Sequence, residues 1–129
     1  MFRNNDDVPE GWIFVFGSNL KGIHGAGAAL HAKTLYGAIQ GVGEGLMGLS
    51  YALATKRTPW EKMTLSEVEF SIEKFCEFIK SRQDLNFYIT RVGCNLAGFN
   101  DEQISDLFKK HLDTSLTNFS LPANWKDLI

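Results

Sequence analysis

The residues that could do chemistry in this sequence gather around its glycines. Nine of the twelve glycines fall between Gly17 and Gly48, and none falls between residues 49 and 92. Glycine permits positive φ angles and lets a ligand touch the backbone without a Cβ atom in the way. Backbone amides exposed in this way at the start of a helix bind phosphate groups. The stretch is therefore the predicted working surface, with a nucleotide-type ligand; the alternative is that these glycines only make tight turns.

Two polar residues inside this stretch are the candidate catalytic groups. Asn19 directly follows Phe16 to Ser18, where its amide could orient a water or hold a ribose hydroxyl, or could simply close an Asx turn. His24 lies among glycines and could act as a polar contact or a proton carrier. Because His24 has no Cys, Asp or second His at ligand spacing, the sequence predicts no metal site.

Cys94 is a candidate nucleophile, but only if a base lies near it. It sits between Gly93 and Asn95 with no histidine close in sequence, which favours a small packing residue. A hydrolase or transferase that uses Cys94 or His24 is nevertheless an alternative to ligand binding. The other histidines, His31 and His111, are predicted to pack on helices.

Familiar nucleotide motifs fail on inspection. Gly43, Gly45 and Gly48 spell GxGxxG, but the motif comes before a predicted strand instead of joining a strand to a helix. The sequence has no Gly-Lys-Ser/Thr, which excludes a P-loop.

The elements that must position these residues alternate between strands and helices. The apolar run 12–16 predicts a strand covered on both faces. Residues 26–36 predict a helix, and 37–48 are too rich in glycine for a regular element. Residues 50–54 predict a second strand and 55–63 a loop. The expected buried stripe of the first helix comprises Ala28, His31, Ala32 and Leu35.

The second half of the chain repeats this alternation. Thr64 and Glu67 form a capping-box signature for a helix that ends near Asp84. A strand is predicted at 86–90, and Asn100 is the predicted N-cap of a helix whose buried stripe includes His111. A final strand is expected around Phe119. The order β-α-β-α-β-α-β predicts a single domain, 1–129, with a three-layer α/β/α fold and a mainly parallel sheet.

The bulk composition narrows the possible partners. The net charge of -2 and a pI near 5.9 give no strong nucleic-acid signal. Two cysteines, Cys76 and Cys94, predict free buried thiols in a reducing compartment. No apolar leader or stretch of 18 apolar residues is present, so we expect a cytoplasmic protein without membrane contact. No cofactor is predicted, and an exposed Trp12 or Trp125 would suit an interface.

Several linked motifs give the sequence a family resemblance. From about residue 12 to 125 it resembles a family of small phage non-structural proteins that also occur in bacterial genomes. The motifs are Phe-Gly-Ser-Asn-Leu, His-Gly-Ala-Gly-Ala-Ala, Ser-Tyr-Ala-Leu-Ala-Thr-Lys and Thr-Arg-Val-Gly-Cys-Asn-Leu-Ala-Gly-Phe. That family carries no established activity to transfer. A non-catalytic factor that binds phage or host proteins is a further alternative.

The same arrangement is more distantly similar to macro domains, which bind ADP-ribose. The resemblance implies that Asn19 contacts the distal ribose, that Gly25 to Gly27 form the glycine loop, and that Thr90 to Gly98 form the phosphate loop. Only Asp6 or Asp7 stands where the adenine-binding aspartate would be. In an open parallel sheet, ligands bind at the carboxyl ends of the strands, where Lys56 could meet a phosphate or be a solvated surface lysine. Trp60 and Phe99 could stack on a base; alternatively Phe99 is buried and Trp60 marks a partner surface. The predicted ligand contacts are Gly17, Ser18, Asn19, Gly22, Gly25, Ala26, Gly27, Thr55, Lys56, Thr90, Gly93, Cys94, Asn95, Gly98 and Phe99.

The leading hypothesis is a macro-like module that binds an ADP-ribose-type or other nucleotide ligand. Hydrolysis of an ADP-ribosyl bond, with Asn19 and His24 as the catalytic residues, is a second hypothesis that ranks below binding.

Overall fold

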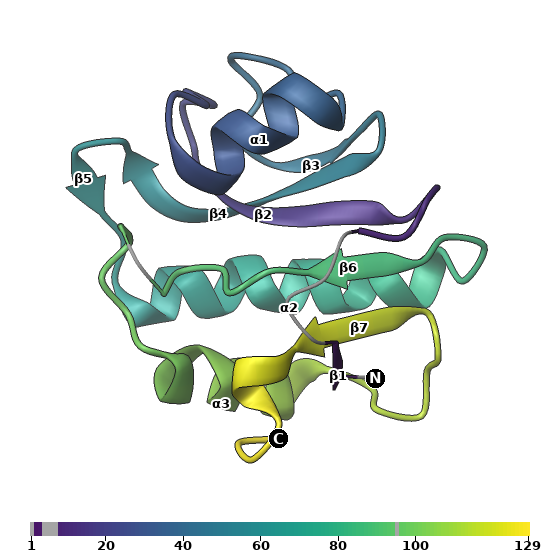
Figure 1. Ribbon diagram of the computed structural model, residues 1–129. Coiled ribbons are helices and arrows are strands. Elements are labelled where there is room, and N and C mark those ends of the chain that lie inside the picture. The colour runs from purple at the N-terminus through teal and green to yellow at the C-terminus, as the bar shows by residue number, and fades with distance from the viewer. Residues whose placement is uncertain (1, 4–7, 95) are drawn as a thin grey trace.

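The apolar run predicted as the first strand forms β2 (Ile13–Asn19), at the centre of the sheet (Figure 1). The structure is a computed structural model that describes residues 2–3, 8–94 and 96–129. The other strands are β1 (Phe2–Arg3), β3 (Gly45–Met47), β4 (Ser50–Thr58), β5 (Glu61–Lys62), β6 (Phe87–Ile89) and β7 (Phe119–Pro122). The helices are α1 (Gly27–Leu35), α2 (Leu65–Ser81), α3 (Asp101–His111) and the short 3₁₀ turn η1 (Ala123–Trp125).

Most strand pairs in the sheet are parallel. The order is β1-β7-β6-β2-β4-β3, and β5 pairs with β4 outside this row. β2 pairs in parallel with both β4 and β6, and β7 does so with both β6 and β1. The short strands β3 and β5 each run antiparallel to β4. The prediction of an α/β fold with a mainly parallel sheet is confirmed.

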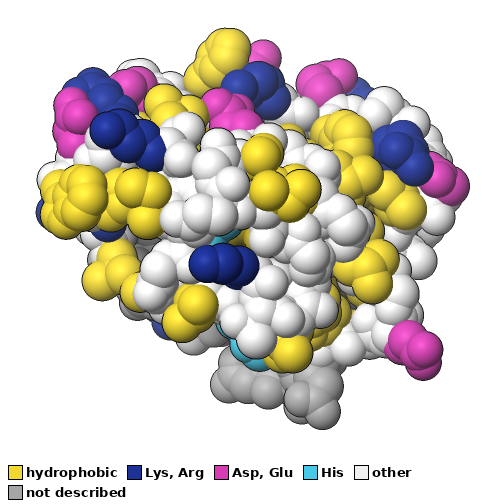
Figure 2. Space-filling model, turned by 90° about the horizontal axis from the view of Figure 1, so that it is seen from above, with side chains coloured by type: hydrophobic (Ala, Val, Ile, Leu, Met, Phe, Trp, Pro, Cys, Tyr) yellow, Lys and Arg dark blue, Asp and Glu magenta, His cyan; other side chains and the backbone are white. Residues whose placement is uncertain are grey.

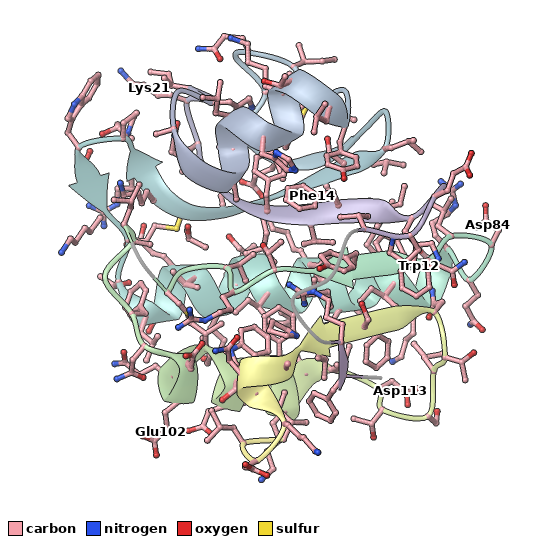
Figure 3. The ribbon with its side chains drawn as sticks, viewed as in Figure 1. Trp12, Phe14, Lys21, Asp84, Glu102 and Asp113 are labelled. Atoms are coloured by element: carbon pink, nitrogen blue, oxygen red, sulfur yellow. The ribbon has the colours of Figure 1, made fainter. Side chains whose placement is uncertain are left out.

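The two faces of the sheet pack against different helices, as the predicted three-layer arrangement requires. Side chains alternate between the faces along a strand, so Ile13 and Val15 join the larger core with α2 and α3. Phe14 and Phe16 point the other way and pack with Ala32 of α1. In Figure 3 Phe14 lies between β2 and α1, and in Figure 1 α2 passes behind β6.

The order of the strands reverses at β2. From β2 the chain passes through α1 and β3 to β4 on one side, and from β4 it passes through α2 to β6 on the other side. The connecting helices change face at the same point. In open α/β sheets such a switch point creates a crevice at the carboxyl ends of the strands.

The predicted starts of two helices are confirmed. Thr64 caps α2 by accepting from the amide of Glu67, whose carboxylate accepts in return from the Thr64 amide. Asn100 and Gln103 make the same reciprocal contacts at the start of α3. Each capping box satisfies N–H groups that the start of a helix otherwise leaves without a partner.

The predicted stripe of α1 is confirmed at Ala32 and wrong at Ala28 and Leu35, while His31 packs its ring against Phe14 without being buried. Ala28 and His31 are exposed, and Leu35 keeps 60% of its surface exposed. The helix has nine residues, of which Ala32 is the buried one, and the half-buried Ala29 and the ring of His31 add to its contact with the sheet. His111, also expected in a buried stripe, is half-buried, and its Nε2 atom lies 2.7 Å from the Glu69 carboxylate on α2.

Two segments predicted as irregular contain strands. Residues 37–48 include β3, which pairs with β4 through a turn at Gly48, where φ is +56°. β4 continues past residue 54 to Thr58 and folds back as β5, so much of the predicted loop at 55–63 is a hairpin. Glycine inside a strand lowers its propensity and hides it from pattern analysis, which explains the missed β3.

Trp125 is not available for an interface. It is fully buried, and its ring centroid lies 5.2 Å from that of Phe108. Both cysteines are free and buried, as predicted. Within residues 2–3, 8–94 and 96–129, no helix is long and apolar enough to cross a membrane.

Candidate functional site

A cavity of about 590 Å³ opens at the carboxyl edge of the sheet, beside the switch point. Its lining comes from the ends of β2 and β4, from the residues that follow β6, and from the start of α1. Three loops that are far apart in the sequence therefore meet at one place, as the parallel sheet predicts. Of the predicted ligand contacts, the lining contains Gly17, Ser18, Asn19, Gly25, Ala26, Gly27, Thr55, Lys56, Thr90, Gly93 and Cys94.

Two predicted contacts on the third loop lie outside this lining. Phe99 is half-buried and packs against the larger core, so its ring is not placed to stack on a base in the cavity. Gly98 lies against the side chain of Lys62 instead. Of the residues weighed from the sequence, Asn95, Asp6 and Asp7 fall outside the described residues.

His24 is fully buried and does not line the cavity. Its Nε2 atom lies 3.0 Å from the carbonyl oxygen of Ile39 and 2.9 Å from that of Val42. Both partners are acceptors, so Nε2 carries the proton and donates it. The ring holds the 39–42 segment in place, and this position does not support the predicted role in proton transfer.

Gly22, another predicted ligand contact, belongs to the same junction. A Cβ atom at Gly22 would lie 2.3 Å from the Val42 nitrogen, and one at Gly43 would lie 2.2 Å from the Asn19 carbonyl oxygen. The hydroxyl of Ser18 donates to the Gly43 carbonyl. Glycine is needed here because two backbone segments touch, and the second half of the glycine-rich stretch thus packs on the first beside the cavity.

Asn19 lines the cavity but is also tied to its own loop. Its Nδ2 atom donates to the Ile23 carbonyl at 2.9 Å, and its Oδ1 atom accepts from the Ile23 amide at 3.2 Å. The alternative that Asn19 closes a local turn is therefore realised in this geometry. One amide hydrogen and one lone pair still remain for a ligand.

The start of α1 presents bare backbone to the cavity. Its N-cap, Ala26, makes no side-chain capping bond, and the first turn carries no acidic residue. A Cβ atom at Gly25 or Gly27 would meet nothing within 4 Å, so the space above them is open. The first N–H groups of a helix have no partner inside the helix and carry a partial positive charge. This edge of the cavity is suited to an anion.

The charged side chains of the lining are cationic. Of the described residues that line the cavity, only Lys56 and Arg91 carry a charge. The Lys56 ammonium donates to the Pro59 carbonyl at 2.9 Å, which holds it near the turn of the β4–β5 hairpin. With two cations and no described carboxylate, the lining favours a negatively charged ligand.

Arg91 is held in place by the carboxylate of Asp101, at the start of α3. Its Nε and Nη2 atoms donate to the two Asp101 oxygens at 2.9 and 2.6 Å. The buried Trp125 donates to the same carboxylate at 2.7 Å. The hydrogen bond with Arg91 lowers the pKa of Asp101 and raises that of Arg91, so both stay charged at neutral pH.

Cys94 is poorly suited to act as a nucleophile. The thiol is buried and lies 3.6 Å from the Val92 carbonyl oxygen. Burial, together with the charge of Asp101, raises its pKa to about 12. A thiol attacks as the thiolate, which is scarce at neutral pH in these surroundings. The geometry therefore favours the packing role over the catalytic one.

The apolar part of the lining and one of its cations were not among the predicted ligand contacts, although several of these residues stand in the quoted motifs. Arg91 could have been predicted, because it comes directly after the third predicted strand, at the start of the loop that lines the cavity. Small apolar residues give no such signal, since in the sequence they look like core residues. The missed lining residues are Ile23, Ala28, Ala29, Pro59, Arg91, Val92, Leu96 and Ala97.

Exposed apolar side chains are frequent around α1, which bears on the alternative of a protein-binding factor. The large ones between residues 20 and 49 are scattered over α1 and the loops beside it. Figure 2 shows the hydrophobic side chains on this face as separate groups with polar atoms and backbone between them. Scattered exposed apolar residues are ordinary on protein surfaces and do not by themselves mark an interface. They are Leu20, Leu30, Leu35, Ile39, Val42, Leu46 and Leu49.

Comparison with known proteins adds no assignment. No family model matches the chain, and no curated protein matches it either.

Proposed function

We propose that this protein binds a phosphate-bearing nucleotide of the ADP-ribose type in the cavity at the carboxyl edge of its sheet. The observation that carries the proposal is the make-up of the lining. Three separate loops and an uncapped helix start converge there, and the described charged residues among them, Lys56 and Arg91, are both cations.

The phosphates belong at the start of α1. Gly25 and Gly27 leave open space in which a phosphate can approach the backbone, and the free N–H groups of the first turn can donate to it. Lys56 adds a positive charge from the second loop. A charge-assisted hydrogen bond of this kind is roughly twice as strong as a neutral one.

Asn19 fits a contact with the sugar. Its amide is fixed in orientation by the two hydrogen bonds to Ile23, which lowers the entropy lost on binding. We propose binding and no catalysis, because His24 is not placed to act as a base and Cys94 is not suited to act as a nucleophile. His24 lies outside the lining, and burial keeps Cys94 protonated.

Isothermal calorimetry with ADP-ribose tests the proposal. We expect saturable binding at one site, and Lys56→Met is expected to weaken it by about tenfold, because one charge-assisted contact is lost. Lys21→Met is the matched control: Lys21 is exposed and not part of the lining, and it projects away from the sheet in Figure 3.

The control should bind as well as the wild type. Absence of heat with ADP-ribose and with ADP would contradict the proposed function. An equal loss in both lysine variants would show that the effect of Lys56 comes from net charge and not from the cavity.

A further inference from the structure

The polar side chains of the cavity lining are already bonded to the protein itself. Thr55 Oγ1 donates to the Ser18 carbonyl at 3.4 Å, and Thr90 Oγ1 donates to the Val15 carbonyl at 2.6 Å. Ser18 donates to the Gly43 carbonyl in the same way. Each hydroxyl has a single hydrogen, which these bonds use. The hydroxyls therefore hold the sheet edge together and cannot also donate to a ligand.

The remaining polar side chains are partly committed, and the amide hydrogen and lone pair that Asn19 keeps are assigned to the sugar. Asn19 is bonded to both backbone groups of Ile23, and Lys56 to the Pro59 carbonyl. Arg91 spends two donors on Asp101. The donors that stay available belong mainly to the two cations, whose charge suits phosphates and does not identify a base.

The rest of the described lining is apolar. Ile23, Pro59 and Leu96 contribute side chains that offer contact surface but no hydrogen bonds, and Leu96 keeps 69% of its surface exposed. Such groups can touch the flat face of a base. Every nucleobase has such a face, so contact of this kind is tolerant of base identity.

We infer that the cavity takes nucleoside diphosphates and their sugar conjugates as a class and does not select the base. This inference rests on the proposed function and narrows it: the diphosphate and the shape of the ligand determine affinity.

Selectivity between bases depends on the polar groups that a wrong base would leave without a hydrogen-bond partner. The bases differ in the donors and acceptors along their edges. A site that hydrogen-bonds such an edge rejects the wrong base strongly, by factors of up to about 10⁴–10⁵, because its own buried groups would be left unpaired. The described lining keeps no hydroxyl donor in reserve that a wrong base could leave unpaired. Discrimination then falls to shape, which amounts to about 10–200-fold at most for small differences in size.

Calorimetry with ADP, GDP, CDP and UDP tests the inference, because these ligands share the ribose and the diphosphate and differ only in the base. We expect the four affinities to lie within about tenfold of one another. Adenosine, which keeps a base and loses the phosphates, is expected to bind at least about thirtyfold more weakly than ADP.

Leu96→Ala gives a second readout that does not depend on any one ligand. It removes apolar surface over the cavity, so we expect a loss of about threefold for all four diphosphates alike. A preference for one base greater than the about 200-fold that shape can supply, or a loss in Leu96→Ala confined to one base, would overturn the inference and leave nucleotide binding intact. If ADP-ribose binds and none of the four diphosphates does, the inference fails and the proposed function stands. If ADP-ribose does not bind either, the proposed function itself fails.

Discussion

α1 and α3 both start at the carboxyl edge of the sheet, but only α3 has side chains that cap the N–H groups of its first turn. Asn100 caps α3 in a reciprocal box with Gln103, and acidic residues occupy its first turn. α1 starts at Ala26 and Gly27, without a side-chain cap and without an acidic residue. The N–H groups that α3 satisfies with its own side chains are thus left by α1 to the cavity.

The difference separates a helix start that is capped by its own side chains from one whose N–H groups are open to the cavity. A missing cap costs a helix about 1 kcal/mol, and α1 has only nine residues over which to recover that cost. The bare start is consistent with a site that an anion completes on binding. Changing either helix start should therefore test the contrast, and the capping box of α2 offers a third case.

Filling the space over the start of α1 should have the largest effect. In Gly25→Leu the new side chain enters the open region above the loop, since a Cβ atom there meets nothing within 4 Å. We expect the affinity for ADP-ribose to fall by about a hundredfold, with the melting temperature nearly unchanged. Calorimetry and thermal unfolding measure the two quantities.

A matched control for this change is Thr117→Leu. Thr117 is exposed in the loop before β7, at the opposite edge of the sheet, and receives the same side chain. Its affinity should equal that of the wild type. Full affinity in Gly25→Leu would mean that the ligand does not lie over this loop.

Giving α1 the cap that α3 has should move stability and affinity in opposite directions. Ala26 has the extended backbone of an N-cap (φ -154°, ψ 161°), so Asp fits there. In Ala26→Asp we expect the free energy of unfolding to rise by about 0.5–2 kcal/mol. The affinity for ADP-ribose should fall by about tenfold, because the carboxylate repels the phosphate and takes its donors. A variant that is both more stable and tighter in binding would contradict the comparison.

Removing the cap of α3 should change stability alone. In Asn100→Ala the Gln103 amide loses its acceptor, and we expect the free energy of unfolding in urea to fall by about 1 kcal/mol. The affinity for ADP-ribose should stay within about twofold of the wild type, since Asn100 does not line the cavity. A large loss of affinity would show that α3 is part of the site.

The smallest expected effect is the change in stability at low pH when Glu67, in the capping box of α2, is replaced. The hydrogen bond from Arg57 lowers the pKa of Glu67 from 4.5 to about 2. A carboxylate with a depressed folded pKa adds stability above pH 4.5 and loses that contribution as the pH falls toward 2. Glu67→Gln should therefore be less stable than the wild type above pH 4.5, with the difference shrinking toward pH 2. Urea midpoints measured from pH 7 to 2 check this, and a constant difference would contradict it.

The main helices and the central strand could be predicted from the sequence, because hydrophobic periodicity and capping residues are patterns within a single segment. The apolar run of β2 and the capping residues Thr64 and Asn100 are local signals, and the structure has each of them. The strand β3 was hidden by Gly45 and the glycines that flank it, and the extension of β4 to Thr58 depends on pairing partners that a single segment does not reveal.

The meeting of three loops at one edge was predictable, because parallel strands place their carboxyl ends together. The sequence did not allow us to predict which residues of these loops face the cavity. His24 sits next to Gly25, but its ring points into the junction with residues 39–42, a contact between two loops that no spacing rule describes. Ala29 and Leu96 belong to the quoted motifs, but the motifs do not show that these two side chains face the cavity.

The buried indole of Trp125 gives the protein an internal optical probe. It donates to the same Asp101 carboxylate that holds Arg91 at the cavity, so a ligand that draws the guanidinium away changes the charge beside the ring. Indole emission shifts with such a change. Trp60 is 83% exposed, Trp12 is half-buried and Trp125 is fully buried, so in a Trp12→Phe variant iodide can quench Trp60 and leave Trp125 visible. The state of a surface arginine can thus be followed by fluorescence from the core, without an added label.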